Sequence, residues 1–240
     1  MPSVAVDNAS SSGADVCELD RLYANLTNGM HAMAQPLTVL RSAVAACSMP
    51  GVTAEAREFY LNVSSEQVER ACAQFLSMRE LLIATQNPAA CVPIDLSELL
   101  SFLAESQGEI CGESGVGIEI VASETLRPIL GDKERTLQSL VALLRIAVSL
   151  SKTGDTVALL VTSCIGTIAL TVQNQHTHGR NLSSSERLNL SVAETNIRSQ
   201  NGNYELMPDP FRVTLTLPTQ AEDLATDKDG WQDAPTVQCR

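Results

Sequence analysis

The chain has 240 residues, of which 44% are hydrophobic and 3% are aromatic, and it carries a formal net charge of −12. This length allows two domains of about 100 residues, each large enough to hold a core. The acidic balance argues against nucleic acid as a partner, because a phosphate backbone requires a basic surface. No apolar run approaches the length of about 18 residues that a membrane span needs, so we expect a cytoplasmic protein without membrane contact.

Residues 1–16 contain a serine-rich stretch and no long apolar region, so we expect a flexible N-terminus that is not a signal peptide. The seven cysteines are scattered and form no Cys-x-x-Cys pair. Several lie on apolar stripes, which predicts buried and reduced thiols. His176 and His178 stand in a polar loop without further ligands at metal-binding spacing, so we expect no metal site there.

Residues 17–86 have the apolar periodicity of two long helices joined by a short turn. In the first segment, apolar residues repeat at intervals of seven with interleaved positions, and the set is Leu19, Leu22, Leu26, Met30, Met33, Leu37, Leu40, Val44 and Cys47. Residues 49–51 predict a turn, and Thr53 is a suitable N-cap for the second helix. That helix carries a stripe of Leu61, Val68, Cys72, Phe75 and Leu82. One hairpin cannot bury both stripes, so we expect a homodimer that forms a four-helix bundle.

His31 lies off the apolar stripe of the first segment and is predicted to be exposed, five residues before Pro36. A proline inside a helix costs about 3 kcal/mol, so its presence suggests a useful kink. Alternatively, Pro36 marks a helix boundary and His31 is an ordinary surface residue. Imidazole suits phosphoryl transfer near neutral pH, because much of it is neutral and nucleophilic.

Residues 92–218 alternate between strand and helix patterns, which predicts a two-layer α+β domain. Asp95 is a plausible cap for a helix, and Asp132 follows a short strand and precedes an apolar helix that ends near Leu150. Further strands are expected at 115–121, 156–163, 166–173 and 211–217, with a short helix at 188–197. Residues 219–240 are polar and acid-rich, which predicts a disordered tail.

This order of segments resembles that of the sensor histidine kinases. Residues 17–86 resemble their dimerisation and phosphotransfer hairpin, because His31, Pro36 and Leu37 match its phosphoacceptor motif. Residues 92–218 resemble their ATP-binding domain of the Bergerat type in the pattern of segments. The resemblance implies that His31 is the phosphoacceptor, and Gln35, one turn beyond it, is placed to orient the ring or a water. It also implies that a response regulator receiver domain contacts the hairpin around Met30, Ala34, Leu37 and Thr38.

Four positions depart from the kinase pattern. Ala32 replaces the acid that follows the phosphoacceptor, and an alanine cannot act as a base. Ile146 replaces the asparagine that holds Mg²⁺, and it offers no oxygen to a hard cation. Asn174 stands near the Asp-x-Gly box that reads adenine, and no glycine follows two residues later. The loop at 182–187 has no glycine for a phosphate cradle.

These departures predict a degenerate kinase core that has lost ATP binding. We expect a histidine phosphotransferase that passes phosphoryl groups between response-regulator aspartates through His31. It would need no cofactor of its own, because the regulator supplies the Mg²⁺. Two alternatives remain at this point: a non-enzymatic adaptor that docks a regulator or a kinase, and a divergent active histidine kinase.

Overall fold

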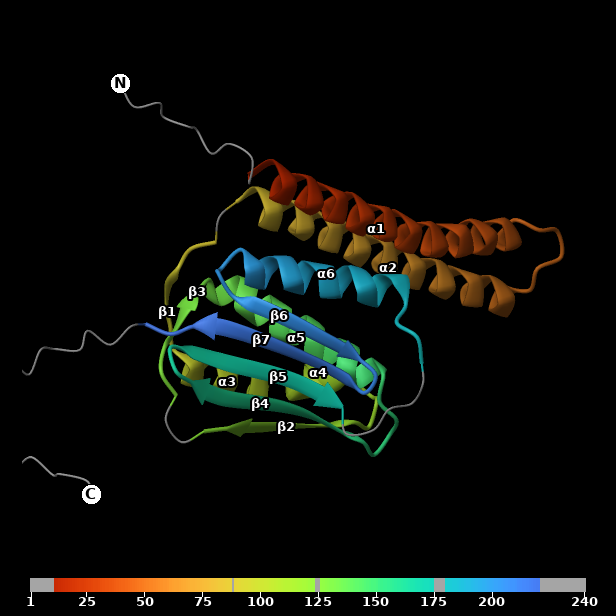
Figure 1. Cartoon of the computed structure of the whole chain (residues 1–240). Coiled ribbons are helices and arrows are strands. Elements are labelled where there is room, and N and C mark those ends of the chain that lie inside the picture. Colours follow the sequence, from red (N-terminus) through yellow and green to blue (C-terminus); the bar gives the residue numbers. More distant parts are fainter. Residues whose placement is uncertain (1–10, 88, 124–125, 175–179, 221–240) are drawn as a thin grey trace, which may run out of the picture.

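The computed structural model describes residues 11–87, 89–123, 126–174 and 180–220. Two long helices form a hairpin that lies beside a domain of strands and helices (Figure 1). The prediction of a helical hairpin followed by a two-layer α+β domain is confirmed. Among the described residues, no helix combines the length and the apolar character that a bilayer span requires.

The hairpin consists of α1 (Ser11–Cys47) and α2 (Ala54–Gln86). Helix α1 continues through Pro36, so the alternative that this proline marks a helix boundary is wrong. It also begins at Ser11, so part of the segment expected to be a flexible N-terminus is helical. Serine and glycine have low helix propensity, which is why the sequence did not predict this first turn.

The turn between the hairpin helices has the predicted chemistry. Gly51 adopts a φ of 83°, a backbone conformation that residues other than glycine rarely adopt. Thr53 caps α2, because its hydroxyl oxygen accepts a hydrogen bond of 3.2 Å from the backbone N–H of Ala56. The chain therefore reverses direction within a few residues, and α1 and α2 pack side by side as antiparallel helices.

The second domain contains the remaining elements. Its helices are α3 (Leu96–Glu105), α4 (Gln107–Cys111), α5 (Lys133–Ser149) and α6 (Ser184–Arg198). Its strands are β1 (Val92–Ile94), β2 (Gly117–Ala122), β3 (Ile129–Gly131), β4 (Thr156–Cys164), β5 (Thr167–Asn174), β6 (Asn203–Pro208) and β7 (Phe211–Pro218). The main sheet has the order β2-β4-β5-β7-β6, in which only β2 and β4 are parallel, and β1 pairs with β3 separately.

Side-chain caps begin three of these helices, and the cap at Asp95 is the one that the sequence predicted. The Asp95 carboxylate accepts from the N–H of Ser97 at 2.8 Å, and the Asp132 carboxylate accepts from the N–H of Arg135 at 3.1 Å. Ser183 caps α6, which begins four residues earlier than the apolar pattern indicated. Strand β6 was not predicted; it pairs with β7 along its whole length.

The core of the second domain lies between the sheet and α3 and α5, which Figure 1 shows behind the strands. Leu103 and Leu140 from the helices and Leu159, Leu170 and Leu215 from the strands have no exposed surface. Burial of one such side chain stabilises the fold by about 1.5–3 kcal/mol. The apolar patterns therefore correspond to a single continuous core.

Helix α6 joins the second domain to the hairpin, because it packs on α1 and α2 as well as on α5. Three side-chain pairs cross this junction at 2.9–3.0 Å: Arg21 with Glu194, Asn25 with Ser191, and Ser77 with Asn189. Gly29 permits the close approach, because a Cβ there would lie 2.7 Å from Cγ of Met78 and 3.4 Å from Cδ1 of Leu188. The hairpin and the second domain thus share a packed interface.

The prediction of buried cysteines is wrong for the described thiols. Cys72, Cys91 and Cys164 are exposed, and Cys47 and Cys111 are only half-buried; all five are free. Helix α2 does carry Cys72 on its apolar stripe, but nothing within one chain covers that side.

Candidate functional site

His31 is exposed on α1, as the periodicity predicted. The three neighbouring positions on the same helix, Ala34, Gln35 and Thr38, are also exposed. Ala34 and Thr38 are small, so they leave the imidazole accessible to a large partner. Gln35 lies one helical turn beyond His31, on the same face, where its amide can reach the ring.

Ala32 and Pro36 lie on the opposite, buried side of α1. Ala32 is only 2% exposed, so an acid at this position would be removed from water. Pro36 lacks a backbone N–H and cannot donate to the carbonyl of Ala32, four residues earlier. The position that follows His31 therefore carries no acid and is buried.

Met30 and Leu37 are also exposed, and they flank Ala34 at spacings of four and three residues on α1. They belong to a row of exposed apolar side chains at intervals of seven on α1, and α2 carries a second such row. We call these the apolar rows: Tyr23, Met30, Leu37 and Val44 on α1, and Leu61, Val68 and Phe75 on α2. Their members are 45–65% exposed. Such spacing is typical of helices that pack against other helices.

Two of the positions that the resemblance aligned with nucleotide ligands are used for packing here. Ile146 on α5 is 3% exposed and belongs to the core. Asn174 at the end of β5 donates from Nδ2 to the carbonyl of Ala147 at 3.0 Å and to Oγ of Ser151 at 3.1 Å. The Asn174 amide thus fastens β5 to the C-terminal end of α5.

The N-terminus of α6 is closed by its own side chains. Ser183 and Glu186 form a capping box, in which each side chain accepts from the backbone N–H of the other residue. The Glu186 carboxylate also accepts from Oγ of Ser149 at 2.6 Å and forms an ion pair with Arg180. Two of the amides that an anion could bind at this helix end are therefore already occupied.

Glu186 is largely buried, and its environment determines its protonation state. Burial acts to raise the pKa of this carboxyl, but hydrogen bonds from Ser149 and Ser183 and the charge of Arg180 outweigh it. The net result is a pKa below the usual value of 4.5. Glu186 is consequently a carboxylate at neutral pH.

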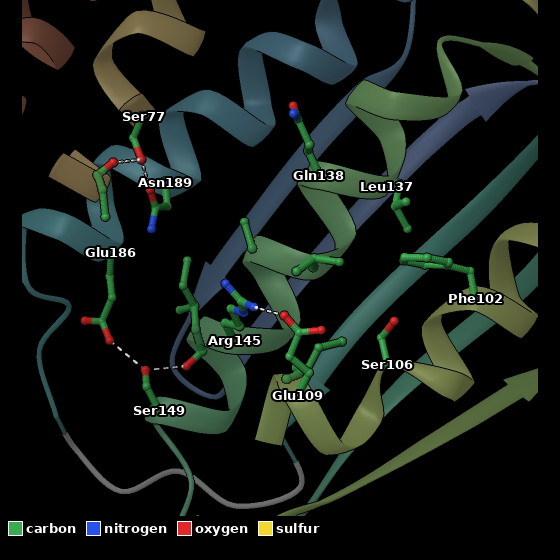
Figure 2. A pocket seen from close by; sticks show the side chains of 15 residues that line it. Ser77, Phe102, Ser106, Glu109, Leu137, Gln138, Arg145, Ser149, Glu186 and Asn189 are labelled. Atoms are coloured by element: carbon green, nitrogen blue, oxygen red, sulfur yellow. Dashed lines mark hydrogen bonds and ion pairs between the residues drawn. The ribbon is translucent and has the colours of Figure 1, made fainter. Parts of the chain in front are cut away.

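An open cleft of about 590 Å³ lies where α2, α4, α5 and α6 meet (Figure 2). Figure 2 shows Arg145 and Glu109 facing each other across the cleft, with 3.7 Å between Nη2 and Oε1. Phe102 and Leu137 lie at one side of it, and the Glu186–Ser149 pair lies at the other. Sequence reasoning missed this cleft, because its residues come from segments that are far apart in the chain and share no motif.

His176 and His178 lie outside the described residues. Within the described ranges, no group of three or more His, Cys, Asp or Glu side chains could hold a metal ion. The open imidazole that the structure offers for chemistry is therefore that of His31 on the hairpin.

Solved structures of histidine kinases share this architecture. Histidine kinase ThkA, in a complex with the response regulator protein TrrA, aligns with a TM-score of 0.66 at 14% identity over 85% of this chain and 63% of that one. Acinetobacter baumannii histidine kinase AdeS aligns with a TM-score of 0.60 at 15% identity over 80% of this chain and 98% of that one. Full-length ShkA, in a complex with AMPPNP, aligns with a TM-score of 0.55 at 16% identity over 83% and 46%.

No protein-family model and no curated protein sequence matches the chain. At this level of identity, the structural matches establish a fold. The chain has the fold of a sensor histidine kinase core, with a helical hairpin followed by an ATPase-like α+β domain.

Proposed function

We propose that the protein is a dimeric histidine phosphotransferase of two-component signalling, which passes phosphoryl groups between response-regulator aspartates through His31 and binds no ATP. The observation that carries this proposal is the pairing of an exposed His31 with the fully packed Ala32 in a histidine kinase fold. An imidazole with free access and no neighbouring acid suits a donor that is already activated.

The chemistry needs little from this chain. A ring nitrogen of His31 attacks the phosphorus of a regulator phospho-aspartate, the P–N bond forms, and the P–O bond to the carboxylate breaks. The carboxylate leaves as an anion, and the other ring nitrogen releases its proton to solvent. Mg²⁺ held by the regulator neutralises the phosphoryl oxygens. The reverse sequence delivers the phosphoryl group to a second regulator.

Dimerisation is supported by the apolar rows. Met30, Leu37 and Phe75 are 65%, 46% and 57% exposed in the single chain, although they continue the heptad spacing. Exposed apolar patches of this extent mark interaction surfaces. We therefore assign Met30 and Leu37 to the contact between two hairpins, and Ala34 and Thr38, with Gln35, to the surface that a receiver domain meets.

Loss of ATP binding is supported by how three positions of the second domain are used for packing and capping. Asn174 bonds to α5, Glu186 closes the N-terminus of α6, and Ile146 offers no oxygen to Mg²⁺. These arrangements favour a phosphotransferase over a divergent active kinase. The second domain would serve as a rigid support for the hairpin and for the docked regulator.

The test is transfer from a regulator carrying labelled phospho-aspartate, followed by a check for protein-bound label that is acid-labile and base-stable. We expect label on the wild-type protein and none on His31→Ala. The His176→Ala and His178→Ala variants are matched controls and should be labelled normally. Label that persists in His31→Ala would contradict the assignment, and a wild-type protein that binds the regulator without label would favour the adaptor.

A further inference from the structure

The cleft between the hairpin and the second domain extends into a second, adjoining cavity. A second cavity of about 180 Å³ adjoins the first, and the two share Ser77, Gln138, Ala142 and Asn189. Together they form one groove along α5, which we call the α2–α5 groove. Its rims carry two exposed apolar side chains, Leu76 at 48% and Phe102 at 50%. An open groove with exposed apolar rims has the character of a protein-docking surface.

The groove opens on the outer side of α2. Successive residues of a helix are about 100° apart around its axis. Phe75 belongs to the apolar row. The next residue, Leu76, lines the groove, and Ser77 after it faces α6, where its hydroxyl donates a hydrogen bond to Asn189. Met78 fills the remaining side, because it packs against Gly29 of α1. Leu76 therefore lies between the apolar row and α6, on the side of α2 that faces away from α1.

His31 occupies the equivalent outer side of α1. Met30 belongs to the apolar row, His31 follows about 100° further around the axis, and Asn25, which bonds to Ser191 of α6, lies about 120° beyond. Within one chain, His31 and the groove therefore point to opposite flanks of the hairpin.

A two-fold pair of hairpins brings them together. When the apolar rows of two copies meet face to face, α1 of one protomer lies beside α2 of the other, because the two-fold axis exchanges left and right. His31 of one protomer and the α2–α5 groove of its partner then share one flank. They also lie at the same height along the bundle. Gly29 of α1 contacts Met78 of α2, so these two residues mark one level. His31 is two residues after Gly29 and Leu76 is two residues before Met78; because the helices are antiparallel, both are displaced from that level in the same direction, by about 3 Å.

We propose that the α2–α5 groove of one protomer docks the receiver domain that exchanges phosphate with His31 of the other protomer. This inference rests on the proposed function, including the dimer. Its support is the continuity of the flank, which runs from His31 over the partner's α2 to the exposed rim residues Leu76 and Phe102. Each site is thus built from two chains, and a single protomer does not complete it.

Heterodimers with one working histidine test this inference. Gln138→Trp fills the groove at an exposed position that lines both cavities, and Glu134→Trp, one turn earlier on α5 and outside both cavities, is the matched control. In the first heterodimer, a wild-type protomer is paired with a protomer that carries His31→Ala and Gln138→Trp. In the second, a Gln138→Trp protomer is paired with a His31→Ala protomer. Two affinity tags isolate each pair, and transfer from a labelled phospho-regulator is timed.

We expect the first heterodimer to transfer at least about tenfold more slowly than the second, which corresponds to about 1.4 kcal/mol of lost docking. The second should match a heterodimer of wild-type and His31→Ala protomers. The Glu134→Trp versions should show no difference between the two pairings. The reverse ranking would place the groove in the same protomer as its histidine, and equal rates would remove the groove from docking. Either result would overturn this inference and leave His31 as the phosphoacceptor, whereas absence of label from the wild-type homodimer would overturn the proposed function itself.

Discussion

The hairpin and the second domain differ in how their apolar side chains are covered. In the second domain, Leu140, Leu170 and Leu215 have no exposed surface. In the hairpin, Met30 and Phe75 are 65% and 57% exposed, although they follow an equally regular pattern. Most apolar side chains of the second domain are therefore covered within one chain, with exceptions such as Phe102, whereas the apolar rows of the hairpin are left uncovered.

The two regions also differ in whether their key polar side chains are hydrogen-bonded within the fold or exposed to solvent. Gln200 in the second domain accepts from the N–H of Asp132 at 2.7 Å and from Thr136 at 3.0 Å, and it donates to the carbonyl of Asn196 at 2.8 Å. Glu186 is equally well bonded. His31 on the hairpin is exposed instead. Groups bonded within the fold support structure, and an exposed nucleophile is available for chemistry with another molecule.

The strongest test of this contrast separates the two hairpins. Leu37→Glu combined with Phe75→Glu places charges in both apolar rows, so we expect complete dissociation to monomers at micromolar concentration. Light scattering would show half the wild-type mass. Val39→Glu, an exposed position outside the rows, is the matched control and should remain dimeric. A double variant of unchanged mass would contradict the assignment of the rows to the dimer.

A second test restores the acid that kinases carry after the phosphoacceptor. Ala32→Glu buries a carboxylate on the packed side of α1, so we expect a loss of roughly 2–4 kcal/mol of unfolding free energy and no label from ATP. Gln35→Glu offers an acid on the exposed side of the same helix and should leave stability within about 0.5 kcal/mol. Chemical denaturation measures both variants. Autophosphorylation of either would show that the second domain still binds nucleotide.

A third test concerns the closed end of α6. Glu186→Gln should cost about 1–2 kcal/mol at neutral pH, because it weakens the capping box and the pair with Arg180. The pKa of Glu186 is lowered by folding, so its contribution is present above pH 4.5 and is lost as the pH falls through the lower folded value. The stability gap between wild type and variant should therefore narrow on acidification. Denaturation at pH 7 and pH 3.5 measures this difference in unfolding free energy, and an equal difference at both pH values would contradict the assignment. Glu58→Gln, at an exposed position, is the control.

The smallest expected effect is the response to nucleotide. A second domain in which Ile146, Asn174 and Glu186 serve packing and capping should gain no stability from millimolar ATP and Mg²⁺, because only a ligand that binds the folded state raises Tm. Thermal unfolding with and without nucleotide should give the same Tm. A rise of several degrees, accompanied by saturable heat in calorimetry, would show that Ile146 and Asn174 do not prevent binding.

Much of the fold could be predicted because its signals are local. The heptad spacing of α1, the cap at Thr53 and the alternation along β7 each depend on neighbours within a few residues. The exposure of His31 follows from the same spacing. Strand β6 escaped prediction because it is an edge strand with Tyr204 as its one buried residue, and it is stabilised by pairing with β7.

The sequence by itself determined the two regions, most of their helices and strands, and the solvent-facing position of His31, because periodicity and capping act over short distances. Only the tertiary structure decided which sides of α1 and α2 receive α6 and which remain open. That choice depends on Gly29, whose missing side chain allows Met78 and Leu188 to approach together. Because α6 takes this side, the apolar rows stay exposed, and His31 and the α2–α5 groove lie on opposite flanks of one chain.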